Sequence, residues 1–350
     1  MHYFSHLPDA LFAKRPTALT NMSPREHIAY GLGALLYMPA TREDISTLIT
    51  TQKFAYLRTL AICLEDAIAD NEVEAAERSL LTHLAALPAD GDLPFIFIRL
   101  RSPEQFVRLA PVLRAYAAVI TGFIFPKFST ANAGAYFTTL ATLNQGLVRP
   151  LYAMPILEST HVLYKEQRMA ELLALKTCID GYADWVLNIR IGATDLCGLY
   201  GLRRDARTPI YDIGLVRELI TDTLNVFMRA PQAYVVSGPV WEYFDEASRA
   251  GLVREVQLDR ANGIVGKTVI HPSHLAIVQA LQAVTLEEYQ DASAILAHST
   301  TTNGVFSSEF RNKMNETKPH LRWAQKIAVR ALVYGVLAHG KTYEDLCASL

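Results

Sequence analysis

Residues 152–158, YAMPILE, are apolar at nearly every position and close on a carboxylate. A short run that is apolar at successive positions predicts a strand buried on both faces, as strands of parallel sheets are. Residues 160–180 follow with helical spacing, and Thr160 is a suitable cap. The apolar residues that share the helical stripe are Val162, Leu163, Met169, Leu172, Leu173 and Ile179. Residues 185–192, WVLNIRIG, predict the next strand, so this region has the alternating pattern of an α/β fold.

The same pattern extends in both directions along the chain. The eight runs that predict strands are 34–39 (ALLYMP), 60–66 (LAICLED), 94–101 (PFIFIRLR), 122–127 (GFIFPK), 152–158, 185–192, 234–239 (YVVSGP) and 266–272 (GKTVIHP). Eight strands alternating with helices favour a closed (β/α)₈ TIM barrel. An open dinucleotide-binding sheet is disfavoured because no GxGxxG motif follows the first run.

Beyond residue 272 the pattern is helical only, over 287–298 and 322–339. The stretch between these helices is typical of a mobile lid or an arm. We therefore expect a barrel domain with an N-terminal extension over residues 1–285 and a C-terminal helical arm or lid over 286–350.

Composition limits the possible partners. Hydrophobic residues make up 51% of the 350 and charged residues 19%, which is a globular balance that excludes a disordered chain. A formal net charge of -2 provides no basic surface for nucleic acid. No segment reaches about 18 consecutive apolar residues, and the four cysteines lie far apart, so we expect no membrane span, reduced thiols and a cytoplasmic location.

In a barrel of this kind the active site lies at the carboxyl ends of the strands, and several runs end in charged residues. The charged residues at or just after these ends are Glu65, Asp66, Arg99, Arg101, Lys127, Glu158 and Asp195. A charged residue often ends a strand simply because the chain meets water there. Glu158 and Asp195, however, follow adjacent strands and share an end with cations, and a few carboxylate oxygens are what Mg²⁺ prefers.

Seven motifs in chain order carry a resemblance to a known family. They are LLYMPA, CLEDAI with the downstream Ala75-Ala76-Glu77-Arg78, IRLR, FIFPKF, PILEST, IGATDL and GKTVIHPSHLAIV. Over residues 34–338 the chain resembles the citrate lyase beta-subunit and malyl-CoA lyase group of the HpcH/HpaI aldolase superfamily. The resemblance implies a Mg²⁺-dependent carbon–carbon lyase that cleaves or condenses a hydroxy or oxo acid, or its acyl thioester, through an enolate and releases a 2-oxo acid such as oxaloacetate.

The resemblance also implies residue roles. Glu158 and Asp195 would ligate Mg²⁺, while Glu65 and Asp66 would hydrogen-bond its waters or orient its ligands. Arg99 would bind a carboxylate of a small carboxylic acid substrate, in a pocket that also holds Arg101 and Lys127. A homo-oligomer built of trimers is implied, because in some members the C-terminal arm covers a neighbouring subunit's site.

Three departures from the family pattern bear on the substrate. Gly31-Leu32-Gly33 stands where members that use CoA thioesters tend to carry an Arg pair, which puts CoA in doubt. Arg101 replaces an Asn, and Arg190 stands at a position that is usually apolar; its side chain would point either into the barrel or toward the helices. In the lid, Glu316 replaces an Asp that transfers a proton, or the base is missing.

Other interpretations remain open from the sequence. The barrel could act on a phosphorylated or phosphoenolpyruvate-like substrate, or it could be a non-catalytic ligand-binding or partner-dependent subunit. Lys127 as a Schiff-base lysine is disfavoured by the neighbouring carboxylates. His271, at the end of the last run, is more typical of a structural histidine than of a catalytic base.

Overall fold

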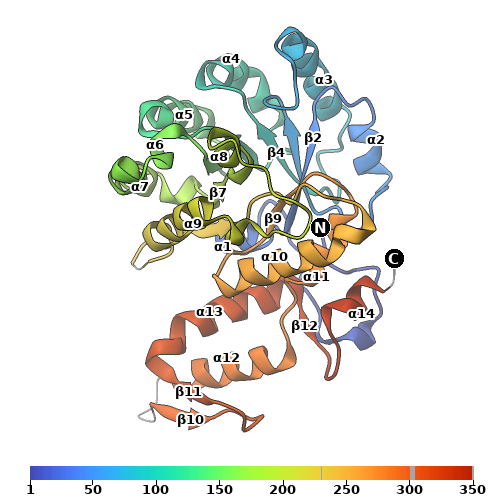
Figure 1. Cartoon of the computed structure of the whole chain (residues 1–350). Coiled ribbons are helices and arrows are strands. Elements are labelled where there is room, and N and C mark those ends of the chain that lie inside the picture. Colours follow the sequence, from blue (N-terminus) through green and yellow to red (C-terminus); the bar gives the residue numbers. More distant parts are fainter. Residues whose placement is uncertain (230, 300–303, 349–350) are drawn as a thin grey trace.

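Parallel strands in the order β8-β7-β6-β5-β4-β3-β2-β9 form the centre of the computed structural model, which describes residues 1–229, 231–299 and 304–348 (Figure 1). They are β2 (Ala34–Pro39), β3 (Thr59–Cys63), β4 (Phe95–Arg99), β5 (Gly122–Phe125), β6 (Tyr152–Leu157), β7 (Asn188–Ile191), β8 (Val235–Ser237) and β9 (Lys267–Val269). A parallel bridge between Gly238 and Lys267 joins the two outer strands. The predicted TIM barrel is therefore confirmed.

Two glycines allow the first and last strands of the barrel to approach closely. Gly33 and Gly266 both have positive φ angles, 52° and 74°. A Cβ on Gly266 would lie 2.5 Å from the Gly33 carbonyl oxygen, so only glycine fits where β2 and β9 begin. The Lys267 amide then donates to the same carbonyl at 2.8 Å and starts the register between the strands.

Each predicted apolar run overlaps one of these strands, and most runs extend beyond the strand. The run 34–39 coincides with β2, and β3 begins one residue before its run. In residues 185–192 the strand begins only at Asn188, because Trp185 still belongs to a short 3-10 turn, Ala183–Trp185. The charged residues that close the runs therefore lie in the loops just beyond the strand ends. That placement puts them at the carboxyl mouth of the barrel.

Helices cover the outside of the barrel (Figure 1). They are α2 (Ile45–Thr50), α3 (Val73–Ala85), α4 (Pro103–Leu113), α5 (Thr130–Asn144), α6 (Thr160–Leu163), α7 (Lys165–Asp180), α8 (Ala193–Leu199), α9 (Gly214–Phe227), α10 (Arg249–Ala261) and α11 (His274–Ala280). Local sequence fixes several starts: Ser102 accepts a hydrogen bond from the Gln105 amide at 3.2 Å and Pro103 opens α4.

The single helix predicted over residues 160–180 is wrong in two respects. Tyr164 has extended backbone angles, φ -74° and ψ 118°, and divides the segment into α6 and α7. The predicted apolar residues also do not share one buried face: Met169 and Leu173 are exposed, while Leu172 and Ile179 are buried. Apolar spacing alone could not show the break, because the residues on either side of Tyr164 keep helical periodicity.

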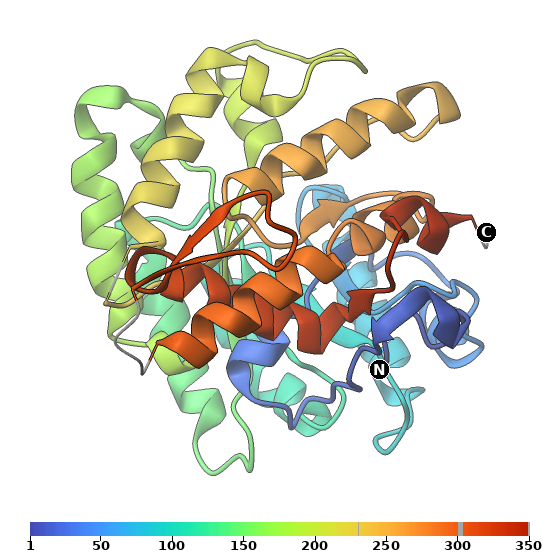
Figure 2. The same ribbon diagram turned by 90° about the horizontal axis from the view of Figure 1, so that it is seen from below.

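The C-terminal elements pack across the amino end of the barrel. They are α12 (Leu286–His298), β10 (Val305–Ser307), β11 (Met314–Glu316), α13 (Thr317–Tyr334), β12 (Val336–Leu337) and α14 (Tyr343–Cys347). Figure 2 shows α12 and α13 lying across this end. The Tyr334 hydroxyl donates to the carbonyl of Tyr30, at the end of α1 (Arg25–Tyr30), at 2.6 Å, and Arg322 donates to the Met228 carbonyl at 3.2 Å.

This attachment is completed by the N-terminal extension. Its short strand β1 (Phe12–Lys14) pairs antiparallel with β12. The predicted helix over 287–298 is confirmed as α12, whereas the one over 322–339 begins earlier, at Thr317, and ends at Tyr334. Of the stretch between them, residues 304–316 include the hairpin β10–β11, and residues 300–303 lie outside the described residues.

Two further expectations concern membranes and thiols. No helix among the described residues is long and apolar enough to cross a membrane. Cys63, Cys178, Cys197 and Cys347 are all free.

Candidate functional site

The charged residues that follow β3 to β6 meet at the carboxyl mouth of the barrel around Arg99. Its Nη2 lies 2.7 Å from Glu65 Oε2, 2.9 Å from Asp66 Oδ2 and 3.6 Å from Glu158 Oε1. The Arg99 guanidinium is nearly buried and also stacks 5.6 Å from the ring centroid of Tyr37. One guanidinium therefore joins carboxylates from two different loops.

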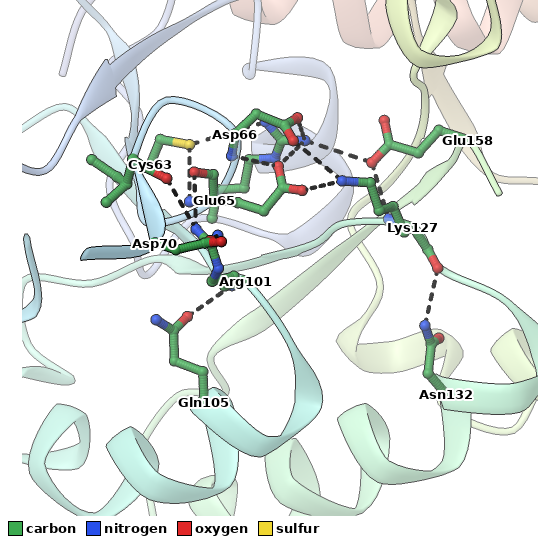
Figure 3. Close-up of polar contacts among 11 residues, drawn as sticks. Cys63, Glu65, Asp66, Asp70, Arg101, Gln105, Lys127, Asn132 and Glu158 are labelled. Atoms are coloured by element: carbon green, nitrogen blue, oxygen red, sulfur yellow. Dashed lines mark hydrogen bonds and ion pairs between the residues drawn. The ribbon is translucent and has the colours of Figure 1, made fainter. Parts of the chain in front are cut away.

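Lys127 connects the same carboxylates from the other side (Figure 3). Its ammonium contacts Glu65 and lies 3.2 Å from Asp66 Oδ1, while its backbone amide donates to Glu158 Oε1 at 3.0 Å. Lys127 has a φ of 46°, a left-handed conformation that is uncommon for a residue with a side chain. This strained backbone directs the amide toward Glu158, and such strain concentrates at functional sites.

Glu158 is held against a glycine of the next loop. A Cβ on Gly192 would overlap the Glu158 carboxylate, so the side chain fits only because residue 192 has none. Asp195, in the first turn of α8, is the neighbouring carboxylate that raises the pKa of Glu158. The two predicted metal ligands therefore come together, one buried and one at the start of a helix.

A cavity of about 150 Å³ opens beside these residues. It is lined by Tyr37, Asp66, Arg99, Ile156, Glu158, Arg190, Ile191, Gly192, Ala193, Thr194, Asp195, Val240, Thr268 and Ile270. Arg190, whose direction the sequence left open, points into the barrel and donates to Thr268 Oγ1 at 2.6 Å. The cavity wall thus carries two buried guanidinium groups and three carboxylates, those of Asp66, Glu158 and Asp195.

The electrostatics separate the carboxylates into two kinds. Burial raises the pKa of Glu158 to about 8; the Arg99 charge opposes this shift and the Asp195 carboxylate adds to it. Burial alone would raise the pKa of Asp66 as well, but the hydrogen bond with Glu65 and the charges of Arg99 and Lys127 lower it to about 2. Asp66 is therefore held as an anion by neighbouring cations, whereas burial raises the pKa of both Glu65 and Glu158. Additional positive charge, such as that of a metal ion, would favour the anionic form of Glu158.

The donor set fits a magnesium ion. Among the described residues no three or more His, Cys, Asp or Glu side chains lie close enough to share a metal. Mg²⁺ does not require three, because it keeps several waters and is usually bound by one or two carboxylates together with substrate oxygens. Glu158 and Asp195 provide two hard oxygen donors, and Asp66 lines the same cavity.

Two predicted site residues are not brought into this cluster. The Arg101 guanidinium is bonded to the loop after β3, through Asp70 and through the Ile68 carbonyl at 3.1 Å. Glu316 lies at the end of β11, which packs with α12 and α13 at the amino end of the barrel. Figure 1 shows this hairpin far from the β4 and β7 region of the same chain.

The Gly31-Leu32-Gly33 segment also lies away from the cavity. It precedes β2 and therefore lies at the amino end, where Gly33 packs against the hydroxyls of Tyr3 and Tyr334. The mouth and this segment are separated by the length of a six-residue strand, about 20 Å. The composition of the segment therefore gives no reason against a CoA thioester at the mouth.

Sequence reasoning missed the residues that support Arg190. Arg190 Nη1 lies 3.4 Å from Asn188 Oδ1, Asn188 donates to Ser237 Oγ at 2.7 Å, and Ser237 donates to the Val265 carbonyl at 2.7 Å. Polar residues inside otherwise apolar strands were the available signal. A buried Asn and Ser two residues or fewer from a strand end require partners, and here those partners lie inside the barrel.

Comparison with known proteins adds family information to this geometry. A family model described as a C-C bond lyase of the TIM-barrel fold matches residues 26–336. Citramalyl-CoA lyase, mitochondrial, from Mus musculus is 36% identical over 322 residues, covering 85% of this chain and 85% of that protein.

Two solved structures share the fold. A citrate lyase from Burkholderia xenovorans LB400 matches with a TM-score of 0.65 and 16% identity, covering 90% of this chain and 96% of that one. The protein CitE from Mycobacterium tuberculosis, in complex with magnesium, acetoacetate and coenzyme A, matches with a TM-score of 0.58 and 21% identity, covering 87% and 99%. At these identities the structures support the barrel architecture, and the family model covers most of the chain.

Proposed function

Because the chain belongs to the C-C bond lyases of the TIM-barrel fold, we propose that its mouth is a Mg²⁺-dependent lyase site built on Glu158 and Asp195. The observation that carries this proposal is the buried Glu158 carboxylate, held against Gly192 beside a second carboxylate. The substrate is a small hydroxy or oxo acid, or its acyl thioester, and one product is a 2-oxo acid such as oxaloacetate. The names of the relatives, a citramalyl-CoA lyase and a CitE structure with magnesium and coenzyme A, agree with this class.

Each residue of the mouth has a defined task in this proposal. Glu158 and Asp195 hold the ion, which as a Lewis acid would favour negative charge on the substrate oxygens. Arg99 binds the substrate carboxylate through its guanidinium, and Lys127 keeps Glu65 and Asp66 charged and in place. Arg190 adds a second buried positive charge on the cavity wall.

Cleavage converts the hydroxyl-bearing carbon into a carbonyl. The hydroxyl proton leaves to a base, the adjacent carbon–carbon bond breaks, and its electron pair becomes the enolate of the departing fragment, which then takes up a proton. Positive groups fixed in a largely buried cavity stabilise this developing charge without reorganising. Condensation is the same sequence in reverse.

The two guanidinium groups on the cavity wall support a second candidate substrate class. Two guanidinium groups, Arg99 and Arg190, line a cavity of about 150 Å³, which suits a phosphoenolpyruvate-like acid as well as an oxo acid. Thermal-shift titrations with pyruvate, oxaloacetate and phosphoenolpyruvate, each with and without Mg²⁺, separate the two. Stabilisation by phosphoenolpyruvate alone would favour the phosphorylated substrate.

The proposal includes a cytoplasmic homo-oligomer made of trimers. Within one chain Glu316 lies at the amino end of the barrel, so it could act as the base only at the mouth of a neighbouring copy. Replacing Glu316 by Gln in the assembled enzyme tests this point. Unchanged lyase activity would assign proton transfer to another group.

The metal site is tested with Glu158→Gln in isothermal calorimetry. The amide keeps the shape of the side chain but removes the charge, so we expect Mg²⁺ binding to be lost and lyase turnover to fall by about 1,000-fold or more. Glu166→Gln, at an exposed position on α7, is the matched control and should bind Mg²⁺ as the wild type does. Wild-type Mg²⁺ affinity in Glu158→Gln would exclude the assignment.

A further inference from the structure

A second cavity lies at the amino end of the barrel, and nothing in the lyase mechanism uses it. Its volume is about 600 Å³, which is several times that of the catalytic cavity and within the range of small-molecule sites. It lies between α10, the loop before β9, and helices α12 and α13. The residues that line it are Tyr30, Met228, Gln257, Arg260, Ala261, Gly263, Ile264, Val265, Glu288, Arg322, Trp323, Lys326, Ile327 and Arg330.

The charges of this amino-end cavity do not balance. Four cations line it, Arg260, Arg322, Lys326 and Arg330, and the only carboxylate in its lining is Glu288. Glu288 is bonded to Arg260, with oxygens 3.2 and 3.4 Å from Nη2. The lining of this cavity therefore carries an excess of three positive charges.

Among the described residues, the other three cations form no ion pair with a carboxylate. The Lys326 ammonium has no hydrogen bond or ion pair within the part of the chain that the structure describes, and Arg322 donates only to a backbone carbonyl. Arg330 is 8% exposed; its Nη2 donates to the Gln282 carbonyl at 2.8 Å, and its Nε has no partner. Arg330 shares the charge of Glu288 with Arg260, so these two guanidinium groups have one carboxylate between them. Buried positive charge in excess of its counter-charge is costly, so the site is suited to an anion.

Burial and the repulsion between these cations both lower the pKa of the buried ones. Burial lowers the pKa of Arg330 to about 10, and the Arg260 charge adds to this shift. Burial likewise lowers the pKa of Lys326, with a further contribution from Arg322. In the adjoining hollow at the same end, Arg25 and Glu26 contribute one charge of each sign and leave the excess unchanged.

We propose that the amino-end cavity binds a small ligand that carries two phosphate groups. One phosphate monoester carries about 1.5 to 2 negative charges, so two phosphates match an excess of three positive charges. Three guanidinium forks suit the oxygens of phosphate in particular, because they donate in pairs. Trp323, 37% exposed on the cavity wall, offers an aromatic face on which a nucleotide base can stack.

The test uses the full-length protein without Mg²⁺ and titrates pyrophosphate by isothermal calorimetry. Wild type should bind one pyrophosphate per chain. Lys326→Met should weaken binding about tenfold and Arg322→Met/Lys326→Met about 100-fold, since each loses a charge-assisted contact. Thermal unfolding of each variant confirms that it is folded; both residues are at least partly exposed.

Two controls distinguish this site from others. Arg254→Met removes one exposed cation from the same helix as Arg260, outside the cavity, and should bind pyrophosphate as the wild type does. Glu158→Gln should also bind normally, so failure of the lyase assignment leaves this result untouched. No binding by the wild type, an equal loss in Arg254→Met, or unchanged binding in the double variant would each overturn the proposal.

Titrations with ADP and with citrate, compared with pyrophosphate, identify the class of ligand. ADP binding more tightly than pyrophosphate, with the gain lost in Trp323→Ala, would identify a nucleotide, whereas equal affinities would identify the diphosphate as the recognised group. Binding of citrate without binding of either phosphate compound would overturn the phosphate class.

Discussion

The two ends of the barrel handle buried positive charge in opposite ways. At the carboxyl mouth Arg99 contacts three carboxylates and Lys127 contacts two, while Arg190 is bonded to the neutral side chains of Asn188 and Thr268. At the amino end, Lys326 and Arg330 have no carboxylate within hydrogen-bonding distance among the described residues. At the mouth, protein carboxylates therefore already position Arg99 and Lys127, whereas the amino-end cavity depends on an anion from outside.

The two regions are joined through the segment that leads into β9. Val265 lines the amino-end cavity, and its carbonyl accepts the hydrogen bond that begins the Ser237–Asn188–Arg190 chain. Thr268, three residues later, binds Arg190 at the catalytic cavity. Residues 265–268, which lead into β9, therefore contact both sites, and a change in either cavity has a covalent route to the other.

The largest difference between the ends should appear when one buried guanidinium is removed from the mouth. Arg99→Met leaves Glu65 and Glu158 buried with less positive charge, which should destabilise the fold by about 3–5 kcal/mol and reduce lyase kcat/KM by about 1,000-fold or more. Urea unfolding and steady-state assays measure the two effects. At the amino end, Arg322→Met should keep kcat/KM within about twofold. Equal losses of kcat/KM in Arg99→Met and Arg322→Met would mean that lyase activity does not depend more on cations of the mouth than on those of the amino end.

The eight strands were predictable because burial on both faces makes parallel strands continuously apolar, as in residues 152–158. Glu158, Asp195 and Arg99 were predictable because strand ends define the mouth. The direction of Arg190 was not, since one residue of register decides whether a side chain faces the lumen or the helices. The amino-end cavity was also beyond sequence reasoning, because its cations come from α10 and α13, about 60 residues apart, and only docking of the arm unites them.

Replacing Gly192 should have a smaller effect, because this change alters the mouth without removing a charge. In Gly192→Ala the new Cβ would displace the Glu158 carboxylate, so we expect a loss of about 1–3 kcal/mol in unfolding free energy and about 100-fold in kcat. Gly198→Ala on α8 is the matched control, because nothing lies within 4 Å of its added Cβ. Alanine there should raise stability by up to about 1 kcal/mol and leave kcat unchanged.

A Gly192→Ala enzyme with wild-type kcat and Mg²⁺ affinity would mean that Glu158 has room to move without loss of function. The close fit between Gly192 and Glu158 would then be a matter of packing alone. In that case the mouth would not be preorganised around Glu158.

The smallest expected effect is that of acid. Acid should lower the free energy of unfolding through a histidine on the mouth side and leave the charges of the amino-end cations unchanged. His274, at the start of α11, donates from Nε2 to the Tyr243 carbonyl at 2.9 Å, and burial lowers the pKa of its imidazole to about 4. The folded chain therefore binds this proton less readily than the unfolded chain does. Stability that is fully present above pH 6.5 should fall by about 1 kcal/mol per pH unit as the pH drops toward 4.

Urea unfolding at pH 7, 6 and 5 measures this dependence. His274→Gln retains an N–H donor for Tyr243 but cannot take up the proton, so its unfolding free energy should change less with pH than that of the wild type by about 1 kcal/mol per unit. If His274→Gln keeps the wild-type dependence, the acid sensitivity belongs to the carboxylates around Arg99, and the mouth rather than α11 is the first region that acid disturbs.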